Sequence, residues 1–183
     1  MQPEVGEVVR RFAERFTDQN GEVVVTRGWD GAVRGIAEWL ERRGVKRVAV
    51  ASSGDNRSSD LIRELRGRFE VVPPGADAAS IEGCGAGVTF PAAAVAETGS
   101  IVEVCHTESD RLVSALPPVH VAHIRAEAVL PDLLQVAGLI RRAAQSRGFA
   151  VTLISGPSRT GDIELRLTLG VHGPHTTVVF LEV

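Results

Sequence analysis

The chain has 183 residues, of which 44% are hydrophobic and 23% charged, and its formal net charge is −3. A chain of this length buries about 70% of its unfolded surface, so we expect a single globular domain over residues 1–183. The mixed charges argue against nucleic acid or an anionic membrane as the main partner. Residues 1–20 carry charges throughout, and no run approaches the roughly 18 apolar residues of a membrane span, so we expect a cytoplasmic protein.

The cysteines and histidines predict no metal centre in this chain. Cys84 and Cys105 belong to no C-x-x-C pair, whereas an iron–sulfur cluster or a structural zinc usually takes about four such ligands. We therefore expect two reduced, buried thiols. His120 and His123 lie three residues apart in an expected strand, so they should face opposite sides of it.

The first half of the sequence alternates helices and strands. Apolar periodicity predicts helices over 3–16, 30–43 and 58–66, and β-branched runs predict strands over 22–26, 45–51 and 69–72. Such alternation implies a mostly parallel sheet with helices on its faces, joined by right-handed crossovers.

The second half is less regular. We expect a short buried strand over 86–90, a helical turn over 91–94, and two short strands bent at Thr98-Gly99 within 95–104. A polar, turn-forming segment follows over 107–118, then a strand over 119–124 and the longest helix over 129–147. Strands over 149–154 and 176–183 complete the prediction.

Three polar loops should reach the same edge of the sheet, at the carboxyl ends of the strands. Ligands of open parallel sheets bind beyond this edge. These loops are Ser52 to Arg57, Glu97 to Ser100 and Ser155 to Asp162. Backbone N–H groups in Gly/Ser turns favour an anion, and Arg57 or Arg159 can add a bidentate grip on phosphate or carboxylate. No loop matches a phosphate-binding or dinucleotide-binding fingerprint.

A structural interpretation of the same residues remains open. Ser158, Thr160 and Asp162 can cap a helix or stabilise a turn without any ligand. Glu97 follows an apolar run, so it is either exposed at a strand end or desolvated and functional. The small residues between 83 and 104 suit a tightly packed hairpin as well as a ligand.

Four segments in order resemble the LUD domain of the lactate utilization protein C family. They are Glu97-Thr98-Gly99-Ser100, the stretch from Arg111 to Leu116-Pro117-Pro118-Val119-His120, Ser155-Gly156-Pro157-Ser158-Arg159-Thr160-Gly161-Asp162-Ile163-Glu164, and Leu169-Gly170-Val171-His172-Gly173-Pro174. The resemblance implies a three-layer α/β/α fold with a mostly parallel sheet, like the ribose-5-phosphate isomerase and CoA-transferase superfamily. It also implies a cytosolic role in oxidising L-lactate to pyruvate beside separate iron–sulfur subunits.

Three hypotheses about function follow. The first is a non-redox subunit of a lactate-oxidising system that binds a small anionic ligand, has no cofactor of its own and relies on iron–sulfur clusters in partner subunits. The second is a stand-alone enzyme acting on a CoA-linked, nucleotide or phosphorylated substrate, with Glu97 as nucleophile or base. The third is a purely structural or regulatory module. The predicted ligand-binding residues are Thr98, Gly99, Ser100, Ser155, Gly156, Ser158, Arg159, Thr160 and Asp162.

Overall fold

A computed structural model gives the architecture of the protein and describes residues 6–145, 150–157, 159–161, 167–169 and 173–183. Its helices are α1 (Glu7–Asp18), α2 (Gly28–Arg42), α3 (Arg57–Leu65), α4 (Ala78–Glu82), α5 (Glu108–Ala115) and α6 (Val136–Ala143), with 3-10 turns η1 (Ala126–Ala128) and η2 (Leu133–Gln135). Its strands are β1 (Glu22–Thr26), β2 (Arg47–Val50), β3 (Glu70–Val72), β4 (Ala86–Thr89), β5 (Ala93–Val95), β6 (Ser100–Cys105), β7 (Val119–Arg125), β8 (Val129–Leu130), β9 (Ala150–Ile154), β10 (Arg159–Gly161), β11 (Leu167–Leu169) and β12 (Thr176–Glu182).

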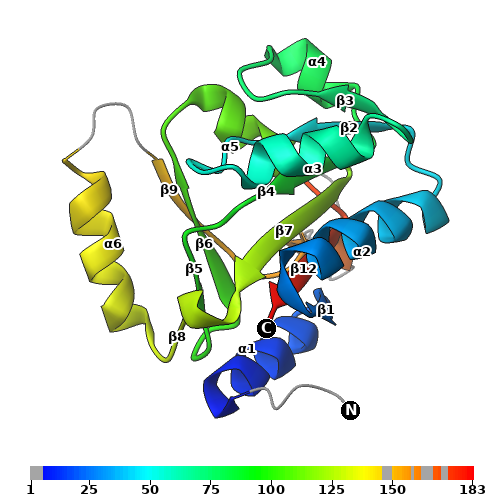
Figure 1. Ribbon diagram of the computed structural model, residues 1–183. Coiled ribbons are helices and arrows are strands. Elements are labelled where there is room, and N and C mark those ends of the chain that lie inside the picture. The colour runs from blue at the N-terminus through cyan, green and yellow to red at the C-terminus, as the bar shows by residue number, and fades with distance from the viewer. Residues whose placement is uncertain (1–5, 146–149, 158, 162–166, 170–172) are drawn as a thin grey trace.

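A six-stranded sheet forms the centre of the fold, with the order β1-β12-β7-β4-β2-β3. Every neighbouring pair in it is parallel. Helices α2 and α3 cover one face, where Ile36, Leu40 and Leu61 pack against apolar side chains of β2, β4, β7 and β12. The other face packs against α1, α4, α5 and a second sheet (Figure 1). The three-layer α/β/α fold with a mostly parallel sheet is therefore confirmed.

The second sheet has four strands in the order β8-β5-β6-β9, and it is mixed. Ala94 and Ile101 face the six-stranded sheet, while Val95 and Val102 face α6 through Val136. Helix α6 consequently lies on the outside of this sheet (Figure 1). The segment 149–154 was expected to feed the parallel sheet, but β9 pairs antiparallel to β6 instead.

The largest error in the predicted elements concerns residues 129–147. They do not form one long helix, because Pro131 disfavours helical geometry at Leu130, which pairs as part of β8. The chain then restarts through Asp132, whose side chain accepts a hydrogen bond from Gln135 N at 3.2 Å. Leu133 and Leu134, which lie within the expected helix, are exposed.

Three smaller differences have local causes. The helical turn expected over 91–94 is absent because Ala92 N donates to Val102 O (2.8 Å) and draws the segment into a hairpin. Helix α5 was not predicted, although Thr107 caps it by accepting from Asp110 N at 3.1 Å. Helix α4 was also missed; Asp77 caps it by accepting from Ser80 N.

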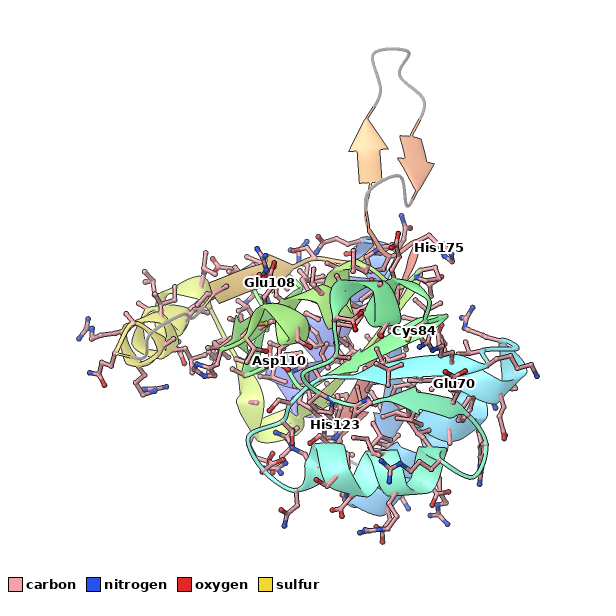
Figure 2. All side chains as sticks on the ribbon, turned by 90° about the horizontal axis from the view of Figure 1, so that it is seen from above. Glu70, Cys84, Glu108, Asp110, His123 and His175 are labelled. Atoms are coloured by element: carbon pink, nitrogen blue, oxygen red, sulfur yellow. The ribbon has the colours of Figure 1, made fainter. Side chains whose placement is uncertain are left out.

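Strands β10 and β11 form a separate antiparallel hairpin. Figure 2 shows this hairpin projecting away from the rest of the molecule. It carries Arg159 and Thr160 of the predicted site. Ser158 and Asp162 lie outside the described residues, as do the side chains of Arg159 and Thr160.

Candidate functional site

The predicted site residues whose side chains the structure describes gather at the turn between β5 and β6, whereas Arg159 and Thr160 belong to β10. Ser100 Oγ and Ser155 Oγ are 2.6 Å apart, which joins this turn to the end of β9. We call residues 97–100 together with 155–156 the hairpin-turn cluster. The loops Glu97 to Ser100 and Ser155 onward therefore do meet, as the sequence suggested.

The hairpin-turn cluster packs closely on the end of α1. Gln19 Nε2 donates to Thr98 O at 2.7 Å. Gly99 (φ +62°) lies against the backbone of Arg15, and Gly156 (φ +80°) lies against the carbonyl of Gln19, so that a Cβ at either position would collide with α1. Both glycines are thus required by backbone conformation and by close approach.

Glu97 is exposed rather than desolvated. Its Oε2 accepts a hydrogen bond from Leu133 N (3.0 Å) at the start of η2, a capping role. Thr98 Oγ1 is buried and has no hydrogen-bond partner among the described residues. The ligand-binding role assigned to this cluster stays a prediction.

A cavity of about 840 Å³ lies elsewhere, at the carboxyl end of the six-stranded sheet. It is bounded by the segments after β2 and β4, by the end of β6 and the start of α5, and by one face of α6. In the sheet, β3 lies on one side of β2 and β4 lies on the other, so the strand order reverses at β2. The cavity opens at this reversal, which is where open α/β sheets bind ligands. Of the three predicted loops, Ser52 to Arg57 contributes to its wall, and no described residue of the other two does.

Ser100 and Cys105 mark the two ends of β6, five residues apart. At about 3.3 Å per residue the hairpin-turn cluster lies about 16 Å from the cavity end of this strand. The cluster and the Ser52 to Arg57 loop are therefore not neighbours. The expectation that all three loops meet at one edge is wrong for this pair, because the β5–β6 hairpin carries residues 97–100 away from the carboxyl ends of β2 and β4.

Three arginines line the cavity, together with the carboxylates of Glu103 and Asp110. Arg57 is held by Asp55, with its Nε 2.8 Å from Oδ2, and Arg125 lies 3.6 Å from the same carboxylate oxygen. Arg142 on α6 is exposed and forms no ion pair with the residues described by the structure. His106 adds a further polar side chain to the wall.

The start of α3 does not offer the free N–H groups that the sequence suggested. Asp55 Oδ1 accepts from Arg57 N at 3.0 Å, and Ser53 Oγ accepts from Ser58 N at 3.0 Å. These two helix-start donors are satisfied within the loop, which leaves the arginine side chains as the charged groups available to an anion.

His123 lies next to the cavity, where its ring contacts aromatic side chains. Its ring centroid is 4.8 Å from that of Trp29. Burial, followed by the positive charges of Arg57 and Arg125, lowers the pKa of His123 to about 3. The neutral ring then accepts from Arg57 at Nδ1 (3.3 Å) and donates from Nε2 to Glu182 (2.9 Å).

His120 faces the opposite side of β7, as expected from its spacing. Its Nε2 lies 2.8 Å from Thr89 Oγ1, and Thr89 in turn donates to Glu103 Oε1 at 2.6 Å. All three residues are buried between the two sheets. Burial alone would raise the pKa of Glu103, but hydrogen bonding and charge interaction with His120, with Ser114 and Thr89 assisting, hold it below the ordinary value.

The sequence analysis missed Glu103, Thr89 and His120 as a group. One signal was present: Glu103 interrupts an apolar strand, just as Glu97 follows one. The partners come from β4 and β7, 14 and 17 residues away along the chain, and only the sheet pairing brings them together.

Two further groups complete the cavity wall. Asp110 uses both carboxylate oxygens, accepting from Ser52 N (2.8 Å) and from the Thr107 hydroxyl (2.7 Å). Burial, reinforced by Glu103 and Asp110, raises the pKa of the Cys105 thiol to about 12, so this thiol stays protonated and is a poor nucleophile. Both cysteines are free and buried, as predicted.

Metal binding and membrane insertion find no support in the described residues. Among them, no three His, Cys, Asp or Glu side chains are grouped to hold a metal ion. No helix within the described ranges has the length and apolar character needed to cross a bilayer.

The solved structure of a DUF162 family protein from Deinococcus radiodurans shares this fold. It superposes with a TM-score of 0.72 over 97% of both chains, at 20% sequence identity. At this identity the likeness concerns the fold alone.

Sequence comparison places the chain beside lactate utilization proteins. It is 34% identical over 91 residues to lactate utilization protein C of Geobacillus kaustophilus, covering 48% of this chain and 38% of that protein. It is 36% identical over 98 residues to the protein of the same name from Bacillus pumilus, covering 51% of this chain and 40% of that protein. The matched stretch thus spans about two fifths of the length of these relatives. The model of the LUD domain matches residues 9–181, and the chain therefore belongs to the LUD domain family.

Proposed function

We propose that this protein acts in bacterial lactate utilization, as a subunit without a redox centre that binds a small anionic ligand in the cavity. The observation that carries the ligand part is the cavity itself, which combines a switch-point position with Arg57, Arg125 and Arg142. The pathway part is supported by the names of the similar proteins.

Arg142 is the side chain best placed to bind the ligand's anionic group. Arg57 and Arg125 already face the carboxylate of Asp55, which neutralises part of their charge. Arg142 has no such competitor among the described residues. A guanidinium binds carboxylate through two parallel hydrogen bonds.

Growth on L-lactate tests the pathway. A strain lacking the gene should fail on L-lactate and grow normally on pyruvate, and the wild-type gene should restore growth. Arg142→Ala should restore it poorly at equal protein level, while Arg34→Ala, at an exposed position of α2, should restore it fully. Normal growth of the deletion strain on L-lactate would contradict the proposal.

Partner subunits with iron–sulfur clusters supply the electron-transfer chemistry in this proposal. Affinity purification of the tagged protein from lactate-grown cells should recover proteins with the visible absorption of iron–sulfur clusters. Recovery of the chain alone, under conditions that preserve complexes, would argue against an assembled role.

The volume of the cavity supports a second candidate function. About 840 Å³ exceeds the needs of a three-carbon acid and lies in the range of cofactor-sized ligands. The alternative is a stand-alone enzyme on a CoA-linked, nucleotide or phosphorylated substrate. Thermal shift measurements with CoA, ATP and sugar phosphates separate the two, because binding to the native state must raise its melting temperature.

A further inference from the structure

Strand β9 is an open edge of the second sheet. It is the last strand in the order β8-β5-β6-β9, and the hairpin that follows it pairs within itself. The other sheet edges carry features that oppose further pairing. Strand β3 has three residues and runs into Pro73-Pro74, β8 has two residues before Pro131, and β1 begins with the charged Glu22. Strand β9 has five residues and contains neither a charge nor a proline.

Exposed apolar side chains gather around this edge. Six large apolar side chains are exposed among the described residues, and four of them belong to β9, to α6 and to the η2 turn before it: Leu133, Leu134, Ile140 and Leu153. Helix α6 and β9 lie together at one side of the molecule (Figure 1). A concentration of exposed apolar groups beside an unpaired strand indicates a surface that another protein covers.

One flank of α6 faces the free edge of β9. Each residue of a helix is turned by about 100° from the one before. Relative to Val136, which packs on the sheet, Leu139 and Arg142 are therefore turned to one side and Ile140 to the other. Leu139 and Arg142 line the cavity together with Ala128, which directly precedes β8. Their flank thus faces β8, and the flank with Ile140 faces β9 at the opposite end of the sheet order.

The hydrogen bonds on the other side of β6 show which backbone groups of β9 are unpaired. Val102 O accepts from Ala92 N of the segment entering β5 (2.8 Å). Because successive residues of a strand turn their N–H and C=O groups to opposite sides, Glu103 turns its groups to β9. There it pairs with Thr152, which accordingly faces β6. The residues on either side of Thr152 therefore direct their N–H and C=O groups to the free edge.

We propose that the protein forms a two-fold symmetric dimer in which β9 pairs antiparallel with β9 of a second copy. Thr152 then lies opposite Thr152 across the axis. The outward N–H and C=O groups of Val151 in each copy meet those of Leu153 in the other, which gives four hydrogen bonds and an eight-stranded sheet. This inference is independent of the anion binding proposed above.

The side chains of β9 favour a second copy over an unrelated strand, because they are complementary to themselves in this register. Val151 and Leu153 lie on the face covered by α6, so each exposed leucine meets the valine of the other copy. Ala150 meets Ile154, a small side chain against a large one. Since β9 is uncharged, no like charges oppose each other across the axis, and a charged strand of another protein would find no counter-charge on it.

The test is the mass of the purified chain, measured by sedimentation equilibrium from about 1 to 200 µM. It should approach twice the chain mass of 19.5 kDa as the concentration rises. Hydrogen exchange should show the amides of Val151 and Leu153 protected in the dimer and rapidly exchanging after dilution. The amide of Thr152 serves as the internal control, because its bond to β6 protects it in both states.

Matched lysine substitutions locate the interface. Leu153→Lys places a charge on the free edge and should raise the dissociation constant at least about thirtyfold. Val25→Lys makes the same change on the edge strand β1, at 45% exposure compared with 44% for Leu153, and should leave the dimer unchanged. Ile140→Lys keeps β9 intact and should raise the dissociation constant at least about fivefold, so the test stays decisive if Leu153→Lys does not fold.

Three results would overturn the inference. The first is a mass of 19.5 kDa that persists at about 200 µM. The second is a dimer weakened by Val25→Lys and not by the substitutions at Leu153 and Ile140, which would place the contact at β1. The third is a dimer in which the amides of Val151 and Leu153 exchange as fast as in the monomer. A monomer that still binds an anion in the cavity would leave the proposed function standing.

Discussion

The two ends of β6 carry two polar regions that differ in kind. At one end, the hairpin-turn cluster is rich in Gly and Ser, and its glycines bring backbone against backbone at the end of α1. At the other end, the cavity gathers charged side chains from separate elements and leaves a carboxylate oxygen of Glu103 unpaired. A sequence segment rich in small polar residues thus indicates close packing as readily as a binding site. That the Glu103 carboxylate has an unpaired oxygen is seen only once the structure is known.

The contrast also concerns how each region is held together. In the hairpin-turn cluster the polar contacts are separate pairs of uncharged groups, such as Ser100 with Ser155 and the carbonyl of Thr98 with Gln19. Around the cavity, polar side chains form connected series, as in Arg57, neutral His123 and Glu182. We therefore expect substitutions in the first region to change stability, and those in the second to change pH dependence and binding.

The largest expected effect is on stability in the hairpin-turn cluster. Gly156→Ala should lower the free energy of unfolding by about 3 kcal/mol, since it combines positive φ with collision against the Gln19 carbonyl. Urea denaturation measures this loss. Gly44→Ala, which has positive φ but no neighbour within 4 Å, should lose only about 1 kcal/mol, and Gly67→Ala, with neither feature, still less. A loss at Gly156 no greater than at Gly44 would show that close packing is not the cause.

The next effect is a pH dependence near the cavity. The pKa of His123 is about 3 in the folded state and about 6.5 when unfolded, so the unfolded chain binds more protons between these values. Stability contributed by neutral His123 is therefore complete above pH 6.5 and declines as pH falls, by up to about 1.4 kcal/mol per pH unit. Urea denaturation at pH 7.5 and pH 5 should show a smaller difference for His123→Gln than for the wild type.

The control for this pH effect is His175→Gln, at an exposed position. It should keep the wild-type difference between pH 7.5 and pH 5. If His123→Gln and the wild type lose equal stability on acidification, another group governs the transition and the contrast between the two regions weakens.

A smaller effect is expected at the contact between the two serines. Ser155→Ala removes the 2.6 Å hydrogen bond to Ser100 and should cost about 1 kcal/mol. Binding of acids in the cavity should be unchanged, because neither serine lines it. A change in binding without a change in stability would instead support the ligand-binding role predicted for these residues from sequence.

The smallest effect on stability is expected for Glu97→Gln. The amide oxygen can still accept from Leu133 N, so the free energy of unfolding should change by less than about 0.5 kcal/mol. Because Glu97 lies outside the cavity, acid binding there should be unaffected. Loss of growth on L-lactate at equal protein level would favour Glu97 as a catalytic residue, and normal growth would count against that assignment.

Much of the fold followed from local patterns. The apolar stripe of α2, including Ile36 and Leu40, is buried as predicted, and β1 has the predicted bounds. Regular periodicity carried these predictions, because a helix face or a strand that enters the main core must be apolar at fixed spacing. The prediction failed where Pro131 interrupted an otherwise helical pattern, and where Ala93 joined a hairpin by pairing with Val102.

The candidate site was only partly accessible from sequence. The Ser52 to Arg57 loop was recognised because it follows a strand and holds typical turn residues. Glu103 was not recognised, since its importance depends on Thr89 and His120, which strand pairing alone brings close. Arg142 belonged to a misassigned helix, so its position beside the strand ends could not be inferred.

The register of β6 decides what chemistry the protein presents between its sheets. Val102 and Val104 flank Glu103 and point to the opposite side of the strand. Shortening the 96–99 turn by one residue and sliding β6 accordingly would place a valine opposite Thr89 and His120 and turn the carboxylate outward. The length of the turn therefore specifies which residue of β6 faces Thr89 and His120, because a slide of one residue turns Glu103 outward and a slide of two puts Ile101 or Cys105 in its place.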